Sequence, residues 1–130
     1  MVNWLKIVLI NLCHSCSASR ILCKRFTSCD LDIALIQEPW THRGKILCLS
    51  LNGYDTFYNT TCARPRSCLT ISSRLKGLLL ANSLDRDIVA IRVNYEHQEH
   101  KDKFTLMSAY LHFEKKNLLS DKMKALIKFC

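Results

Sequence analysis

Hydrophobic and polar positions follow two different periods in the first third of the chain. Leu5–Asn11 is a nearly continuous apolar, β-branched run, the pattern of a strand covered on both faces. Apolar positions then recur at helical spacing over residues 18–29, after Ser15 or Ser17, either of which is able to cap a helix. A second short apolar run follows at Ile33–Ile36. Strand, helix and strand with short connections predict a βαβ unit with two parallel strands.

After residue 40 the pattern changes to short strands separated by polar turns. No helical pattern lies between them, so they predict an antiparallel meander. The expected strands are Tyr54–Tyr58, Ser67–Ser72, Leu78–Ala81, Ile88–Val93 and Phe104–Leu111. A helical pattern at Lys116–Cys130 ends the chain without a stop signal, which predicts that the domain is truncated.

The composition is that of one packed domain. The chain has 130 residues, of which 48% are hydrophobic and 23% are charged, and these values favour a globular core over disorder. No apolar stretch approaches the roughly 18 residues of a membrane span. The first apolar run is short, adjoins Lys6 and is interrupted by Asn11, unlike a signal peptide. We therefore expect a single intracellular domain over residues 1–130 with no membrane partner.

The net charge of +8 is concentrated in the middle of the chain. Residues 41–76 carry six basic side chains and one acidic side chain, a net charge of +5. The basic residues are Arg43, Lys45, Arg64, Arg66, Arg74 and Lys76. Such a surface raises the local concentration of polyanions such as DNA. A solvated positive face without a partner accounts for the charge equally well.

Eight cysteines allow two interpretations. Their even number is compatible with the disulfide framework of a secreted binding module. However, Cys13, Cys23, Cys48 and Cys68 lie in or beside apolar stretches, where a free cysteine behaves as a small hydrophobic residue. This favours reduced, buried thiols. Cys13 and Cys16 have zinc-knuckle spacing, but the sequence offers no second compact pair to complete a structural zinc site.

Two polar residues stand at the ends of the predicted parallel strands. Asn11 ends the first strand and Glu38 ends the second. The carboxyl ends of parallel strands meet at one edge of a sheet, where ligands bind in open α/β sheets. Pro39 disfavours helical backbone at Glu38, which predicts an extended residue with its carboxylate at this edge. A carboxylate beside an amide suits Mg²⁺, although ordinary strand-end residues that contact water give the same pattern.

Three motifs together resemble the endonuclease/exonuclease/phosphatase superfamily, and within it the endonuclease domain of non-long-terminal-repeat retrotransposons. The first is Asn11 at a strand end followed by Ile33–Trp40, which finishes Gln-Glu-Pro-Trp. The second is Arg64–Cys68 before an apolar strand, and the third is Ser108–Tyr110 at the end of a strand. The resemblance covers residues 4 to about 115 in the order of the family.

The resemblance implies a fold, an activity and three site residues. The fold class would be α/β, part of a four-layer α-β-β-α sandwich whose mixed sheet opens with the βαβ unit. The activity would be Mg²⁺-dependent hydrolysis of phosphodiester bonds in DNA, which nicks the target site of a retrotransposon in the nucleus. Glu38 would bind the Mg²⁺ ion, and Asn11 would orient metal or phosphate. Tyr110, which the resemblance places at the end of a later strand of the same sheet, would contact the scissile phosphate.

The sequence departs from this family in two places. Leu111-His112-Phe113 follow Tyr110 where the family has a short loop with Pro or Asn. The later Asp/Asn pair and the terminal Asp-His pair of the family have no counterpart in these 130 residues. Because the loss of one preorganised group costs about 100- to 1,000-fold in rate, we expect the chain alone to be inactive. A non-catalytic nucleic-acid-binding remnant that uses residues 43–76 and a secreted disulfide-rich module are the alternatives.

Overall fold

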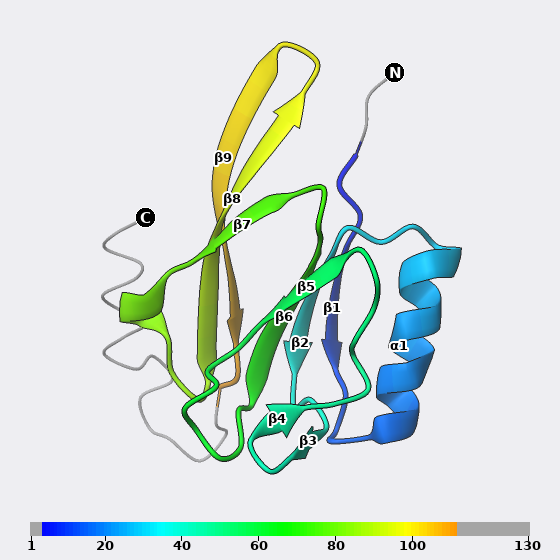
Figure 1. Ribbon diagram of the computed structural model, residues 1–130, viewed down its shortest axis with the longest axis vertical. Helices are drawn as coiled ribbons and strands as arrows, with labels where there is room; N and C mark the ends of the chain where they lie inside the picture. The colour runs from blue at the N-terminus through cyan, green and yellow to red at the C-terminus, as the bar shows by residue number, and fades with distance from the viewer. Residues whose placement is uncertain (1–3, 112–130) are drawn as a thin grey trace.

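A computed structural model describes residues 4–111, a range in which one α-helix lies to one side of the β-strands (Figure 1). The elements are β1 (Ile7–Asn11), α1 (Cys16–Ser28), β2 (Ile33–Gln37), β3 (Thr41–His42), β4 (Lys45–Ile46), β5 (Tyr54–Phe57), β6 (Ser67–Ser72), β7 (Lys76–Leu79), the 3-10 helix η1 (Ala81–Ser83), β8 (Ile88–His97) and β9 (His100–Ala109). The mixed α/β class is therefore confirmed. The helix predicted at Lys116–Cys130 lies outside the described residues.

The chain opens with the predicted βαβ unit. β1 and β2 pair in parallel along their whole length, and their last pair is Asn11 with Gln37. Ser15, rather than Ser17, caps α1, since its Oγ accepts a hydrogen bond from the Ala18 N–H at 3.1 Å. α1 has 13 residues. No helix between residues 4 and 111 combines the length and apolar character that a membrane crossing requires.

The strands divide between two sheets. β2 also pairs with β6, and β6 with β5, both antiparallel, which gives a mixed sheet in the order β1-β2-β6-β5. β7, β8 and β9 form a second, antiparallel sheet. The strands predicted after residue 40 are thus confirmed, with shifted ends. The single continuous meander is wrong, because the chain leaves the first sheet after β6 and starts the second at β7.

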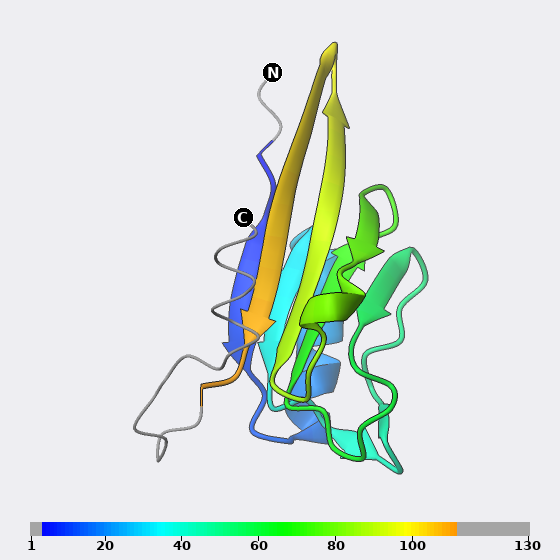
Figure 2. The ribbon, with the colours of Figure 1, turned by 90° about the vertical axis from the view of Figure 1, so that its left-hand side faces the viewer.

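The mixed sheet has an apolar layer on each face. In β2, Ala34 and Ile36 belong to the cluster formed with Phe26 of α1, whereas Ile33 belongs to the cluster formed with Val89 of β8. This alternation follows from the two-residue period of a strand. The described chain consequently has three layers, namely α1, the mixed sheet and the second sheet (Figures 1 and 2).

Among residues 4–111, β1 is covered on the face toward α1 only. Val8 and Ile10 pack into the cluster beneath α1, while Ile7 and Leu9 on the opposite face are 48% and 65% exposed. The second sheet packs on β2 and β6, so within residues 4–111 it leaves this face of β1 uncovered. The expectation that this strand is covered on both faces is confirmed for the face toward α1, and for the other face it stays a prediction.

β8 and β9 extend beyond the core as a long hairpin (Figure 1). Their pairing runs from Ile88 with Ala109 to His97 with His100. The outer part of the hairpin is largely exposed, which explains why its polar residues were not recognised as strand from the sequence. The two-residue turn contains Gln98 at φ 51°, as expected for a tight hairpin.

Candidate active site

Four polar residues lie immediately outside four strand ends. Glu38 follows β2, Arg66 precedes β6, Asp87 precedes β8 and Tyr110 follows β9. We call these four residues the rim. β2 and β6 belong to the mixed sheet, and β8 and β9 to the second sheet. The rim is therefore assembled across the boundary between the two sheets.

Backbone hydrogen bonds fix the spacing of the rim. The Glu38 N–H donates to the Arg66 carbonyl oxygen at 2.9 Å. The Tyr110 N–H donates to the Asp87 carbonyl oxygen at 2.8 Å. The two sheets are joined by the Arg66 N–H, which donates to the Arg86 carbonyl oxygen at 2.8 Å. The side chains thus leave from backbone positions that are tied to one another.

Glu38 does not have the extended backbone that Pro39 predicted. Its φ is +48°, a left-handed conformation that is unusual for a residue with a side chain. Two contacts explain the correction: the Glu38 N–H is held by Arg66, and the Glu38 carbonyl oxygen accepts a hydrogen bond from the His14 N–H at 2.8 Å. A strained residue of this kind costs roughly 1–3 kcal/mol and persists when its surroundings determine it.

Glu38 and Tyr110 are joined through their side chains. A hydrogen bond to the Glu38 carboxylate raises the pKa of Tyr110, and burial and the negative charge of Glu38 raise it further. The Arg66 guanidinium carbon lies 4.6 Å from the centre of the Tyr110 ring, a cation–π arrangement. The phenol therefore keeps its proton at neutral pH and is held between an anion and a cation.

Arg66 is held in turn by Asp87. Its Nε donates to Asp87 Oδ1 at 2.6 Å, and a terminal guanidinium nitrogen donates to Oδ2 at 2.7 Å. This two-point contact is the strong form of the arginine–carboxylate pair, and it raises the pKa of Arg66. The side chains of Arg66 and Asp87 are 16% and 21% exposed, so the pair is only partly screened by water.

Asn11 ends β1, the parallel neighbour of β2. Its side chain is exposed, and its Oδ1 accepts a hydrogen bond from the Cys13 N–H at 2.8 Å. The neighbouring ends of the two parallel strands are confirmed. The close approach of the Asn11 and Glu38 side chains stays a prediction.

Tyr110 reaches the rim by a different route from the one expected. The sequence interpretation placed it at the end of a strand in the same sheet as Glu38. It follows β9, which belongs to the second sheet. The two residues meet because the sheets pack face to face, not because their strands are neighbours.

A chain of buried hydroxyl groups lies directly beneath the rim. The Ser67 hydroxyl donates to Ser108 Oγ at 2.7 Å, and the Ser108 hydroxyl donates to the Ile36 carbonyl oxygen at 3.1 Å. Both serines are fully buried. Ser67 adjoins Arg66, and Ser108 lies two residues before Tyr110. The chain links β6, β9 and β2 at the point where the rim residues emerge.

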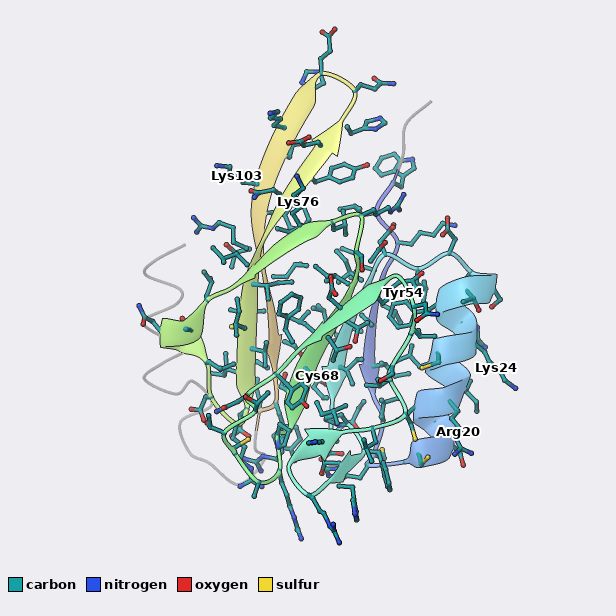
Figure 3. The ribbon with its side chains drawn as sticks, in the orientation of Figure 1. Arg20, Lys24, Tyr54, Cys68, Lys76 and Lys103 are labelled. Atoms are coloured by element: carbon teal, nitrogen blue, oxygen red, sulfur yellow. The ribbon has the colours of Figure 1, made fainter. Side chains whose placement is uncertain are left out.

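The basic residues of the middle segment do not form one surface. Arg66 precedes β6 and Arg74 follows it, so these two lie at opposite ends of that strand. Arg74 pairs with the buried carboxylate of Asp32. Lys76 starts β7 at the end distant from the β3–β4 hairpin (Figure 3). The basic residues of the segment 43–76 are thus divided between the two ends of β6, and Arg66 is their member at the rim.

Two contributors to the site were not recognised from the sequence. Asp87 is separated from Arg66 by 21 residues, and only its position before an apolar run marks it. Trp40 was recognised only as part of the Gln-Glu-Pro-Trp motif. It lines a cavity of about 320 Å³ beside the rim. Neither role has a local sequence signal.

The oxygen donors of the rim decide which kind of Mg²⁺ coordination the site suits. Among residues 4–111 no group of three or more His, Cys, Asp or Glu side chains is placed to hold a metal ion. Mg²⁺ usually keeps several water ligands and uses one or two carboxylates together with substrate phosphates. Glu38 is half-buried and supplies one carboxylate, while the Asp87 carboxylate is engaged by Arg66. The residues present therefore fit a hydrated Mg²⁺ ion and not a fully protein-bound one.

A solved structure shares this fold. The endonuclease domain of TRAS1, a telomere-specific non-LTR retrotransposon, superimposes on the chain with a TM-score of 0.69 and 17% sequence identity. The match covers 95% of this chain and 51% of the other. The chain has the fold of a retrotransposon endonuclease domain, over about half of that protein's length. No protein-family model matches the sequence, and no curated protein matches it significantly.

The structural match confirms the resemblance that the three motifs indicated. At 17% identity it establishes the fold and leaves the chemistry to be argued from the residues. The coverage is consistent with the expected match to the N-terminal half of such a domain.

Proposed function

We propose that the rim is part of the DNA-cleaving site of a Mg²⁺-dependent endonuclease. The convergence of Glu38 and Tyr110 on Arg66 is the observation that carries the proposal: the Glu38 N–H donates to the Arg66 carbonyl oxygen, and the Arg66 guanidinium lies over the Tyr110 ring. It brings a carboxylate and a protonated phenol to one point from two different sheets. A metal ligand and a phosphate contact of a phosphodiesterase need this proximity, whereas two unrelated strand-end residues do not.

In this proposal Glu38 holds the metal ion, and the Asn11 amide orients metal or phosphate. When bound, Mg²⁺ stabilises negative charge on the phosphodiester in the transition state and positions water. The raised pKa keeps Tyr110 protonated, and its single O–H, which contacts Glu38 in the free protein, would turn to donate to a phosphate oxygen once Glu38 holds the metal ion. Arg66 fixes the Tyr110 ring from the face, while its own charge is balanced by Asp87.

The substrate and the complete fold belong to the same proposal. The matched domain is an endonuclease of a retrotransposon, which supports a nucleic-acid substrate, and we propose DNA that is nicked in the nucleus. We propose that the complete fold is a four-layer α-β-β-α sandwich, and the packing of the helix and the two sheets on one another supports this. We propose that the 130-residue chain alone does not cleave, since the groups that complete the family's site have no counterpart in its sequence.

Paramagnetic Mn²⁺ tests the metal site without relying on catalysis. NMR line broadening during a Mn²⁺ titration should centre on Glu38, Asn11 and Tyr110, and excess Mg²⁺ should reverse it. Glu38→Gln should abolish it. The control is Glu96→Gln, which removes an exposed carboxylate that lies 3.6 Å from Lys101 in the outer hairpin. Broadening that persists in Glu38→Gln would refute the assignment of Glu38.

Plasmid nicking tests the proposed inactivity separately. The chain in Mg²⁺ should leave supercoiled plasmid DNA intact beyond the level of a buffer control. Mg²⁺-dependent nicking that Glu38→Gln removes would contradict the inactivity and retain the site. Nicking that Glu38→Gln does not change would point to a contaminating nuclease.

A further inference from the structure

The cavity beside the rim has walls of an unusual composition. Its volume is about 320 Å³, which is at the small end of the range for ligand sites. The lining residues are His14, Trp40, Thr41, Arg64, Arg66 and Arg86. Three of the six are arginines, one is tryptophan, and none is acidic. Arg66 belongs to both the cavity and the rim, so the two share a wall.

The arginines of the cavity have different surroundings. Arg66 is neutralised by its pairing with Asp87. Arg64 and Arg86 are exposed, and Arg86 Nε donates to the Arg64 carbonyl oxygen at 3.1 Å. This contact joins the loop before β6 to the loop before β8. The cavity therefore presents positive charge from two loops that a hydrogen bond holds together, as a site for a phosphate group does.

Trp40 supplies an oriented aromatic surface. It is half-buried, and its carbonyl oxygen accepts a hydrogen bond from the Leu47 N–H at 3.1 Å. The His42 ring lies nearly parallel to the indole, with 6.3 Å between the ring centres and 9° between the planes. An aromatic face next to arginines is the combination that binds unpaired nucleotides, because a base stacks on the ring and the phosphate contacts the guanidinium groups.

We infer that this cavity binds one unpaired nucleotide of a DNA strand next to the rim, with its base on Trp40 and its phosphate at Arg64 and Arg86. The choice of DNA rests on the proposed function. The cavity holds a nucleotide rather than a duplex, since the base faces of a duplex are stacked on one another and cannot reach an indole. The shared Arg66 wall places the bound nucleotide beside the position proposed for the scissile phosphate.

The two tryptophans of the chain allow a direct test. Trp4 is 80% exposed, so a Trp4→Phe protein keeps the fold and reports Trp40 fluorescence alone. The probe is a single-stranded hexamer of deoxyadenylate in EDTA, which removes any requirement for a metal ion. The matched probe is a hexamer of the same charge in which every base is absent. The base-containing hexamer should quench Trp40 and bind about 10-fold more tightly than the abasic hexamer.

Substitutions in the same background separate stacking from charge. Trp40→Leu should weaken binding of the adenylate hexamer by about 10-fold, measured by anisotropy of a labelled probe, while Trp40→Phe should retain most of it. Arg64→Ala and Arg86→Ala should each weaken binding and reduce its salt dependence. Lys103→Ala removes one exposed charge from the outer hairpin (Figure 3) and should change affinity by less than about 2-fold.

Several results would overturn the inference. Equal quenching and affinity for the two hexamers, or full binding by Trp40→Leu, would show an electrostatic surface without a base site. The absence of binding to either hexamer would show no site at all. Failure of the Mn²⁺ experiment at Glu38 leaves these results unaffected, because they are measured in EDTA. Binding here without a metal at Glu38 would support the cavity and remove the nuclease assignment.

Discussion

The buried hydroxyl chain beneath the rim predicts a specific pattern of energetic coupling. Ser108→Ala removes the hydrogen bond from Ser108 to the Ile36 carbonyl oxygen and also the acceptor of the Ser67 hydroxyl. A lost hydrogen bond costs roughly 1 kcal/mol, and a buried hydroxyl left without its partner costs about 1–3 kcal/mol. We therefore expect Ser108→Ala to lower the free energy of unfolding by about 2.5 kcal/mol.

The complementary substitution should cost less. Ser67→Ala removes one hydrogen bond but leaves Ser108 donating to Ile36, so the expected loss is about 1 kcal/mol. In the double variant the Ser67 hydroxyl is absent, and the expected total is about 2 kcal/mol rather than the sum of about 3.5 kcal/mol. The coupling of about 1.5 kcal/mol lies in the range found for contacting residues.

Urea unfolding of the four proteins of this cycle, followed by circular dichroism, measures each term. Ser73→Ala is the control, because Ser73 is exposed and its substitution should change stability by less than about 0.5 kcal/mol. Additive effects of Ser67→Ala and Ser108→Ala would refute the reasoning. A loss in Ser108→Ala no larger than that in Ser67→Ala would refute it as well.

Two further predictions concern titratable groups. Glu38→Gln should lower the pKa of Tyr110, since it weakens the hydrogen bond and removes the negative charge that raise it; tyrosinate absorbance during a pH titration, with Tyr110→Phe as the reference, measures this, and an unchanged pKa would contradict the contact. In alkylation followed by mass spectrometry, the exposed Cys13 and Cys29 should react quickly, while Cys68 should react only on unfolding, since burial excludes the reagent and raises its thiol pKa. Fast labelling of Cys68 in the folded protein would show that its burial beneath α1 is incorrect.

The βαβ unit could be predicted from the sequence because its signals are local. The second apolar run, Ile33–Ile36, matches β2 to within one residue, and the helix begins directly after one of the two proposed caps. The apolar run and the helix cap are each recognised from residues that are close together in the sequence. Short connections then determine that the strands are parallel. The relation between Asn11 and Gln37 follows from this topology alone.

The division into two sheets could not be predicted in this way. Ser67–Ser72 is buried along nearly its whole length. The sequence pattern of a strand buried on both faces does not indicate which strands pair with it. No residue between β6 and β7 marks the change of sheet. The backbone of Glu38 was mistaken for a related reason. A residue before proline prefers extended backbone, but two hydrogen bonds to residues distant in sequence outweigh this preference at Glu38. The His14 N–H donates to the Glu38 carbonyl oxygen, and the Glu38 N–H donates to the Arg66 carbonyl oxygen.

The site residues also divide into those that a local motif identifies and those whose role depends on contacts between distant segments. Glu38 and Tyr110 were recognised by motif, and Arg66 was noted both within the Arg64–Cys68 motif and for its charge. The function of Arg66 depends on Asp87 and Tyr110, which approach it only after the second sheet has packed on the first. A motif identifies a residue type at a position, but a pairing across two sheets has no spacing that a sequence pattern could capture.

The position of the rim at the sheet boundary makes its geometry depend on packing between the sheets. Glu38 and Arg66 leave the mixed sheet, whereas Asp87 and Tyr110 leave the second sheet. A shift of one sheet against the other would therefore separate the Tyr110–Glu38 and Arg66–Asp87 contacts together. The buried Ser67–Ser108 hydrogen bond opposes that shift because its directional geometry is lost after a small displacement. The packing between the two sheets therefore determines both the stability of their interface and the order of the candidate active site. A substitution that removes the Ser67–Ser108 hydrogen bond should also increase the mobility of the Tyr110 side chain.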